Sequence, residues 1–182
     1  FVESRNVPAD FHVKGAVYVG QPLTLSGDFN IDGEIYVNNG VNLNGYDLTV
    51  GGTAWLSSTL NINKGKLYIN GDLNLSSTSK GISYGYLTMQ NDEDYIFVGG
   101  EMFVYSGYAN STLTAGTIEL QGDFTQKVWG SSNNFSCSGT HKMLLSGSGL
   151  QTISFASTDS GFNVVDVKNF SEEGILFSTA AT

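Results

Sequence analysis

Residues 67–75 read LYINGDLNL, and this stretch contains the pattern that repeats along the chain. Gly71 is preceded by an apolar-x-apolar triplet and is followed, after one residue, by a second such triplet. The same arrangement surrounds five other glycines, which are Gly15, Gly33, Gly52, Gly100 and Gly122. Successive glycines are 18, 19, 19, 29 and 22 residues apart, so the basic unit has about 18 to 19 residues and the later units carry insertions. Self-similarity at a fixed period is typical of solenoid proteins.

Each unit contains three short triplets, in which two apolar residues flank an outward-facing one, as the twofold period of a β-strand requires. The first face comprises residues 11–13, 29–31, 48–50, 67–69, 96–98 and 118–120, the second face 17–19, 35–37, 54–56, 73–75, 102–104 and 124–126, and the third face 23–25, 41–43, 60–62, 87–89, 113–115 and 135–137. Equivalent triplets would stack with a rise of about 4.8 Å per coil. The sequence therefore predicts an all-β fold, a three-sided parallel β-solenoid (β-helix) of about seven coils. We expect right-handed winding, because parallel crossovers are right-handed.

The chain is predicted to form one domain over residues 1–182, with regular coils over 1–137 and irregular C-terminal coils or a cap over 138–182. Alternation persists at 143–145, 153–155, 162–167 and 175–177, which indicates a seventh coil and part of an eighth, or a cap. The sequence begins at Phe1 without Met, which favours a processed protein or a piece of a larger one.

Composition and charge exclude several classes of partner. The formal net charge is −9, Arg5 is the only arginine, and the lysines are scattered. Because binding to phosphates requires a basic surface, we expect no nucleic-acid partner. No run of 18 apolar residues is present, so no membrane insertion is expected. The single cysteine, Cys137, lies in an alternating run and is predicted to be a small buried hydrophobe.

The outward column of the second face is rich in aromatic residues. It reads Tyr18, Tyr36, Trp55, Asn74, Phe103 and Thr125 along successive coils, and Tyr68 and Phe97 add two aromatics on the first face. Large exposed aromatic side chains usually meet a partner, and their flat apolar faces suit sugar rings. The column therefore predicts a carbohydrate platform formed by Tyr18, Tyr36, Trp55 and Phe103. The alternative, that a loop or a neighbouring module covers the column, stays open.

The insertions follow the second face in three consecutive coils, at residues 76–86, 105–112 and 127–134. Stacking should bring these loops together, and loops inserted on one side of a repeat protein often form its binding surface. Their aromatic residues are further candidates for carbohydrate contacts: Tyr84, Tyr86, Tyr105, Tyr108 and Trp129. Packing of the loops against each other is the alternative.

The acidic residues do not form a recognisable catalytic site. The residue after the repeating glycine is acidic in several coils, at Glu34, Asp72, Glu101 and Asp123. Such residues commonly bind backbone amides in turns, although a calcium ion between them is a possibility that the sequence leaves open. Residues 92–94, Asp-Glu-Asp, are interpreted as a solvated turn. Because the two histidines, His12 and His141, lie at opposite ends of the predicted stack, no enzyme and no cofactor is expected.

Four segments of the chain read LYINGDLNL (67–75), IFVGGEMFV (96–104), AGTIELQGDFTQ (115–126) and SGTHKMLLSGSGLQTISF (138–155). They resemble β-solenoid segments of large secreted and cell-surface proteins of Gram-positive anaerobic bacteria. The resemblance implies a secreted or cell-surface location, neighbouring modules in the same polypeptide, and a polysaccharide or surface glycan as partner. It implies no site residues.

Together these features predict an extracellular, non-catalytic module that binds carbohydrate such as cellulose or another plant polysaccharide. The alternative function is a structural spacer or adhesin segment that mediates protein or cell attachment.

Overall fold

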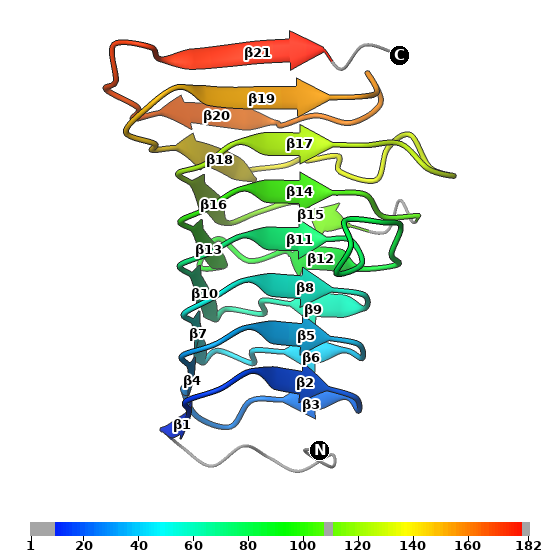
Figure 1. The fold of residues 1–182 in the computed structure, drawn as a ribbon, viewed down its shortest axis with the longest axis vertical. Coiled ribbons are helices and arrows are strands. Elements are labelled where there is room, and N and C mark those ends of the chain that lie inside the picture. Colours follow the sequence, from blue (N-terminus) through cyan, green and yellow to red (C-terminus); the bar gives the residue numbers. More distant parts are fainter. Residues whose placement is uncertain (1–9, 108–110, 180–182) are drawn as a thin grey trace.

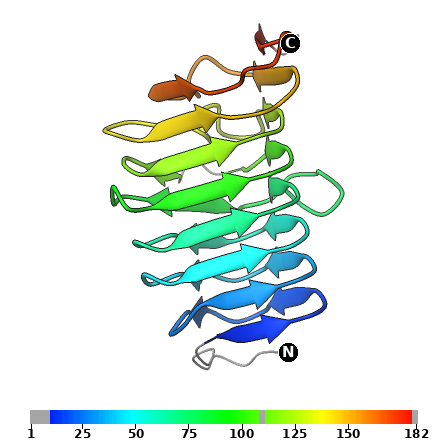
Figure 2. The same ribbon diagram turned by 90° about the vertical axis from the view of Figure 1, so that its left-hand side faces the viewer.

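The computed structural model describes residues 10–107 and 111–179, and this part of the chain contains strands and no helix. The strands form three parallel sheets that stack as a β-solenoid of about eight turns (Figure 1). The first-face sheet contains β1 (Phe11–Val13), β4 (Phe29–Ile31), β7 (Asp47–Val50), β10 (Lys66–Ile69), β13 (Tyr95–Val98), β16 (Thr117–Leu120), β18 (Lys142–Leu145) and β20 (Val164–Val167). Figure 2 shows these strands one above another.

The other two sheets follow the same stacking order. The second-face sheet contains β2 (Val17–Val19), β5 (Ile35–Val37), β8 (Ala54–Leu56), β11 (Leu73–Leu75), β14 (Met102–Val104), β17 (Phe124–Gln126), β19 (Gln151–Phe155) and β21 (Ile175–Thr179). The third-face sheet contains β3 (Leu23–Thr24), β6 (Val41–Asn42), β9 (Thr59–Asn61), β12 (Tyr86–Met89) and β15 (Thr112–Leu113). The predicted triplet at 135–137 joins this face only through single bridges, such as the one between Leu113 and Cys137.

The register confirms the coil period that the sequence predicts. Leu67 pairs with Leu48 on one side and with Ile96 on the other, and Tyr36 pairs with Trp55. The inward side chains of these columns form one buried core along the stack, from Val17 to Ile153. Because each coil contacts only its neighbours, the core grows by one layer per coil.

The repeating glycines form a column in which consecutive coils touch through their backbones. The amide of Gly71 donates a hydrogen bond to the carbonyl of Gly52 at 3.1 Å, and the amide of Gly100 donates to Gly71 at 2.9 Å. A Cβ atom on Gly71 would lie 2.8 Å from the carbonyl carbon and oxygen of Gly52. Glycine recurs at this corner because no side chain fits between successive coils.

Two of the four acidic residues beside this column bind the next coil. Asp72 accepts a hydrogen bond from the backbone amide of Glu101 at 2.8 Å, and Asp123 accepts one from the amide of Thr152 at 2.7 Å. Glu101 forms an ion pair with Lys80 at 3.0 Å. These contacts agree with the interpretation of the column as turn acids that satisfy backbone donors.

The C-terminal coils continue the stack and contain an aromatic cluster. Phe124 is fully buried, and its ring centroid lies 5.0 Å from those of Phe135 and Phe155 and 4.9 Å from that of Phe162. These four rings replace the aliphatic side chains that fill the earlier coils. Strands β20 and β21 are the last in their sheets, so their inward residues lack a covering layer; Val165, for example, is 40% exposed.

Cys137 is half-buried against the core, and burial raises the pKa of its thiol to about 12. Its packing against the core agrees with the prediction of a small hydrophobe, but the side chain is only partly buried.

His141 is fully buried, and neither ring nitrogen has a hydrogen-bond partner among the described residues. Burial lowers the pKa of this imidazole to about 4, below its ordinary value of 6.5. The imidazole of His141 is therefore protonated less readily in the folded protein than in the unfolded chain. The stability that neutral His141 provides is present above about pH 6.5 and is lost as the pH falls toward 4.

We expect the free energy of unfolding to fall by about 2 kcal/mol between pH 7 and pH 5 through this group. Urea unfolding at several pH values would measure the fall. The His141→Leu variant should show a smaller decrease over the same interval. An equal decrease in both proteins would contradict the assignment to His141.

Candidate functional site

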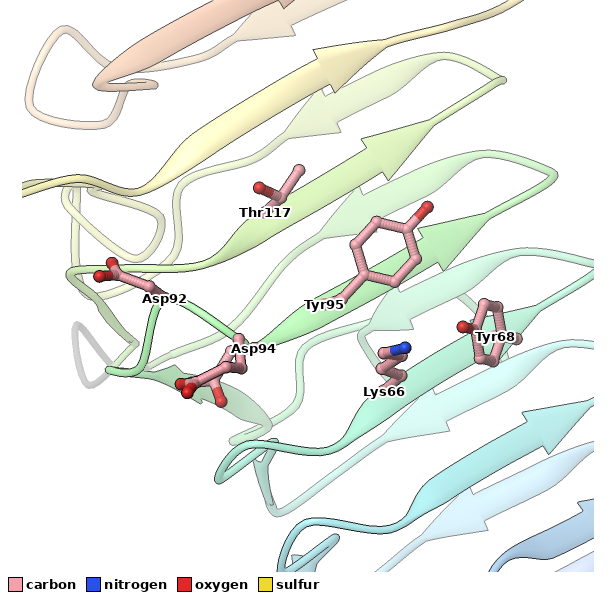
Figure 3. A pocket seen from close by; sticks show the side chains of 7 residues that line it. Lys66, Tyr68, Asp92, Asp94, Tyr95 and Thr117 are labelled. Atoms are coloured by element: carbon pink, nitrogen blue, oxygen red, sulfur yellow. The ribbon is translucent and has the colours of Figure 1, made fainter.

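A pocket of about 410 Å³ lies on the first face, beside the turn that connects β12 to β13 (Figure 3). Its lining comprises Lys66, Tyr68, Asp92, Glu93, Asp94, Tyr95 and Thr117. Lys66 and Tyr68 come from β10, Tyr95 from β13 and Thr117 from β16, so three consecutive coils build one wall. The turn at residues 91–94 supplies the acidic side.

Two tyrosine rings provide the apolar part of the pocket. The centroids of Tyr68 and Tyr95 lie 5.9 Å apart, and the ring planes are inclined by 57°. The hydroxyl of Tyr95 donates a hydrogen bond to Glu119 at 2.6 Å, which holds this ring in place. Partial burial and the bond to Glu119 raise the pKa of Tyr95, so the phenol stays protonated. Because the rings are inclined, they form a concave corner rather than covering each other.

Asp94 holds the turn on the acidic side of the pocket in place. Its side chain is almost fully buried. One carboxylate oxygen accepts a hydrogen bond from the amide of Lys64 at 2.6 Å, and the other accepts bonds from the amides of Gln90 and Asn91 at 2.7 and 3.0 Å. Three backbone donors therefore fix the turn on the preceding coil, and Asp94 serves as its anchor.

The remaining polar groups are available at the surface. Asp92 and Glu93 are exposed, and Asp92 accepts one hydrogen bond from the hydroxyl of Thr140 at 3.0 Å. Within residues 10–107 and 111–179, neither Lys66 nor Glu93 has an ion-pair partner. Figure 3 shows Lys66 on the side of Tyr68, across the pocket from Asp92. The pocket thus combines two aromatic surfaces with free hydrogen-bonding groups, the composition typical of small-ligand sites.

The predicted platform on the second face has a different geometry. Tyr18 and Tyr36 stack with their centroids 4.5 Å apart and their planes within 3° of parallel. Tyr36 also donates its hydroxyl to Glu34, and this hydrogen bond raises the pKa of Tyr36 to about 12. Stacked in this way, each ring covers one face of the other, while Tyr18 remains 61% exposed. Trp55 follows in register and is half-buried.

Phe103 is not part of an exposed platform, and the expectation of exposure is wrong at this position. Its side chain is only 6% exposed. The ammonium groups of Lys80 and Lys127 lie 5.3 and 5.5 Å from its ring centroid, and Tyr105 packs against it with its edge. The first insertion thus reaches over the second face after Trp55, and Asn74 beneath it is fully buried.

The three insertions meet at one corner, as their shared position in the coil predicts. Ser83 and Ser106 form a parallel bridge, and a Cβ atom on Gly107 would lie 3.0 Å from the ring of Trp129 and 3.1 Å from that of Tyr84. The rings of Tyr84 and Trp129 therefore pack on Gly107 while remaining 49% and 44% exposed. This agrees with the alternative in which the aromatics pack the loops together. Their contact with carbohydrate remains a prediction.

Tyr86 begins β12 and is half-buried, as is Tyr105. Tyr108 lies outside the described residues.

The sequence predicts the outward position of Tyr68 but does not predict the pocket. Tyr95 immediately precedes a first-face triplet, at the same phase as Lys66 and Thr117. This shared phase places the three side chains in one outward column. From this phase alone, the sequence could have predicted the wall of the pocket. The prediction of a solvated turn at residues 92–94 is wrong for Asp94, which is almost fully buried, because nothing in the sequence shows that this side chain binds the amide of Lys64 in the preceding coil.

No metal site emerges from the part of the chain that the structure covers, which contains no group of three or more His, Cys, Asp or Glu side chains arranged to hold a metal ion. Nor do the described residues form a helix that is long and apolar enough to cross a membrane.

Comparisons with protein-family models, with curated proteins and with solved structures found no match to this chain.

Proposed function

We propose that this chain is an extracellular, non-catalytic module that binds saccharides in the pocket between Tyr68, Tyr95 and the turn at 91–94. The observation that carries this proposal is the joint presence of two inclined tyrosine rings and unpaired polar groups around one cavity of about 410 Å³. Sugar rings have apolar C–H faces that suit aromatic surfaces, and their hydroxyl groups both donate and accept hydrogen bonds. Lys66 can donate to such a hydroxyl, and Glu93 can accept from one.

The arrangement of the acids supports a binding role over hydrolysis. The two carboxylates of a glycosidase flank the scissile bond from opposite sides. In this pocket Asp92 and Glu93 are neighbours on one exposed turn, and Asp94 is committed to three backbone amides. The acids can therefore orient a hydroxyl group but do not face each other across a substrate.

A location outside the cell and an origin in a larger surface protein belong to the same proposal. They are supported by the resemblance of segments such as 67–75 and 96–104 to solenoids of Gram-positive surface proteins. A structural spacer or adhesin segment is the second candidate. The stacked pair of Tyr18 and Tyr36 favours it, because this cross-strand contact stabilises adjacent coils.

The test is saccharide binding by the wild type and by two Tyr→Ala variants. Depletion from solution by insoluble cellulose and chitin would first identify a ligand, and calorimetric titration with the matching soluble oligosaccharide would then give affinities. Tyr68→Ala should weaken binding about tenfold, equivalent to about 1.4 kcal/mol, because it removes one aromatic wall. Tyr18→Ala, which removes a 61% exposed ring on the second face, should leave the affinity unchanged.

The two variants separate the possible outcomes. A loss in Tyr18→Ala with full affinity in Tyr68→Ala would place the site on the second face and refute the pocket. Absence of binding by the wild type to either polysaccharide would reject the saccharide proposal for this ligand class and favour the spacer.

A further inference from the structure

We infer that the pocket selects saccharides that carry a protonated amine over neutral and acidic ones. This inference rests on the proposed function and adds the chemical class of the ligand. It is based on the charges of the side chains that surround the two tyrosines.

Three carboxylates and one ammonium line the pocket: Asp92, Glu93 and Asp94 against Lys66. The formal charge of the lining is therefore −2. The carboxyl oxygens of Asp94 accept hydrogen bonds from three backbone amides, so the position of this side chain in the wall is fixed. The overall charge of the protein, −9, has the same sign and does not offset this local field.

The single cation, Lys66, lies beside the two tyrosines, because it pairs in register with Tyr95 and precedes Tyr68 by two residues on β10. Lys66 lies across the pocket from Asp92 (Figure 3). Its charge also acts on Asp47, its neighbour in the adjoining coil, since burial and Asp28 raise the pKa of Asp47 whereas Lys66 lowers it. On the other side Asp92 and Glu93 present exposed carboxylates, and Asp92 also accepts a hydrogen bond from the hydroxyl of Thr140.

An amino sugar can contact the acidic turn and the two tyrosines at the same time. The ammonium would face Glu93 and Asp92 and donate charge-assisted hydrogen bonds to them. The faces of Tyr68 and Tyr95 attract cations as well as C–H groups. A uronic acid would instead bring a carboxylate toward the carboxylates of Asp92 and Glu93, and these like charges repel each other.

The test compares three probes of equal length: oligomers of glucosamine, glucose and galacturonic acid. Titration at about pH 6, above the ordinary pKa of carboxyl groups, should show the glucosamine oligomer binding about tenfold more tightly than the glucose oligomer. The galacturonate oligomer should bind most weakly. The preference should shrink in 1 M salt, where the screening length is about 3 Å.

Two double variants with equal charge changes test the residues. Asp92→Asn combined with Glu93→Gln should reduce the preference for glucosamine to within about twofold. Glu172→Gln combined with Glu173→Gln neutralises two exposed acids on the connection before β21, and it should retain the full preference.

Each remaining outcome is informative. Equal binding of the glucosamine and glucose oligomers by the wild type would overturn the inference and leave the proposed function intact. An equal loss of preference in both double variants would show that overall charge, and not the pocket, is responsible, and it would also overturn the inference. If no probe binds, the proposed function itself fails.

Discussion

Replacement of Phe124 by Ala is expected to lower the free energy of unfolding by about 3–5 kcal/mol, the range for truncating a buried aromatic residue in a packed core. Phe124 is fully buried and contacts the rings of Phe135, Phe155 and Phe162. Its removal leaves a cavity between the seventh coil and the coil before it. Since a solenoid is stabilised by contacts between neighbouring coils, the damage should be concentrated in the C-terminal coils.

Urea unfolding would measure the total loss, and amide hydrogen exchange would show its location. Exchange should accelerate in β18 to β21 and change little in β1 to β8. Phe170→Ala provides the matched control, because this ring is 91% exposed and its removal should cost less than about 0.5 kcal/mol. Similar losses in both variants would refute the role assigned to the aromatic cluster.

Gly71→Ala is expected to destabilise the protein by about 3 kcal/mol, toward the upper end of the usual cost of overpacking. The added methyl group would lie 2.8 Å from the backbone of Gly52, and backbone atoms cannot move aside as a flexible side chain can. Relief would require two adjacent coils to separate, which would weaken the hydrogen bond between these glycines.

The control substitution lies in the same column. Gly15→Ala places its methyl group in open space, with no atom within 4 Å, so its effect on unfolding should be within about 0.5 kcal/mol. Thermal and urea unfolding of the two variants would measure the difference. Equal stability of Gly71→Ala and Gly15→Ala would contradict the explanation of the repeating glycine by close contact of coils.

These two predictions rest on the part of the structure that the sequence determines most clearly. Triplets such as 67–69 and 73–75 alternate inward and outward residues, and the glycine between them keeps a constant phase. A parallel stack is the arrangement that buries all the inward positions and brings every glycine to one corner. The strands β10 and β11 therefore lie where the pattern predicts.

The surface could be predicted only in part, because side-chain orientation depends on contacts between coils. The outward position of Tyr18 and Tyr36 follows from the period of two, whereas their face-to-face stacking does not. Burial of Phe103 depends on the path of the first insertion and on the reach of Lys80, which the local sequence does not specify. The pocket likewise depends on Asp94 binding the amide of Lys64, a contact between residues in different coils.

The measurement that tests the proposed saccharide site most directly is nuclear magnetic resonance of the isotope-labelled protein during titration with the soluble saccharide that binds it. We expect the largest shifts of the amide signals at Tyr68, at Tyr95 and along residues 92–94, with little change at Tyr18 and Tyr36. Shifts confined to the second face or to the loops carrying Tyr84 and Trp129 would contradict the assignment of the pocket as the binding site.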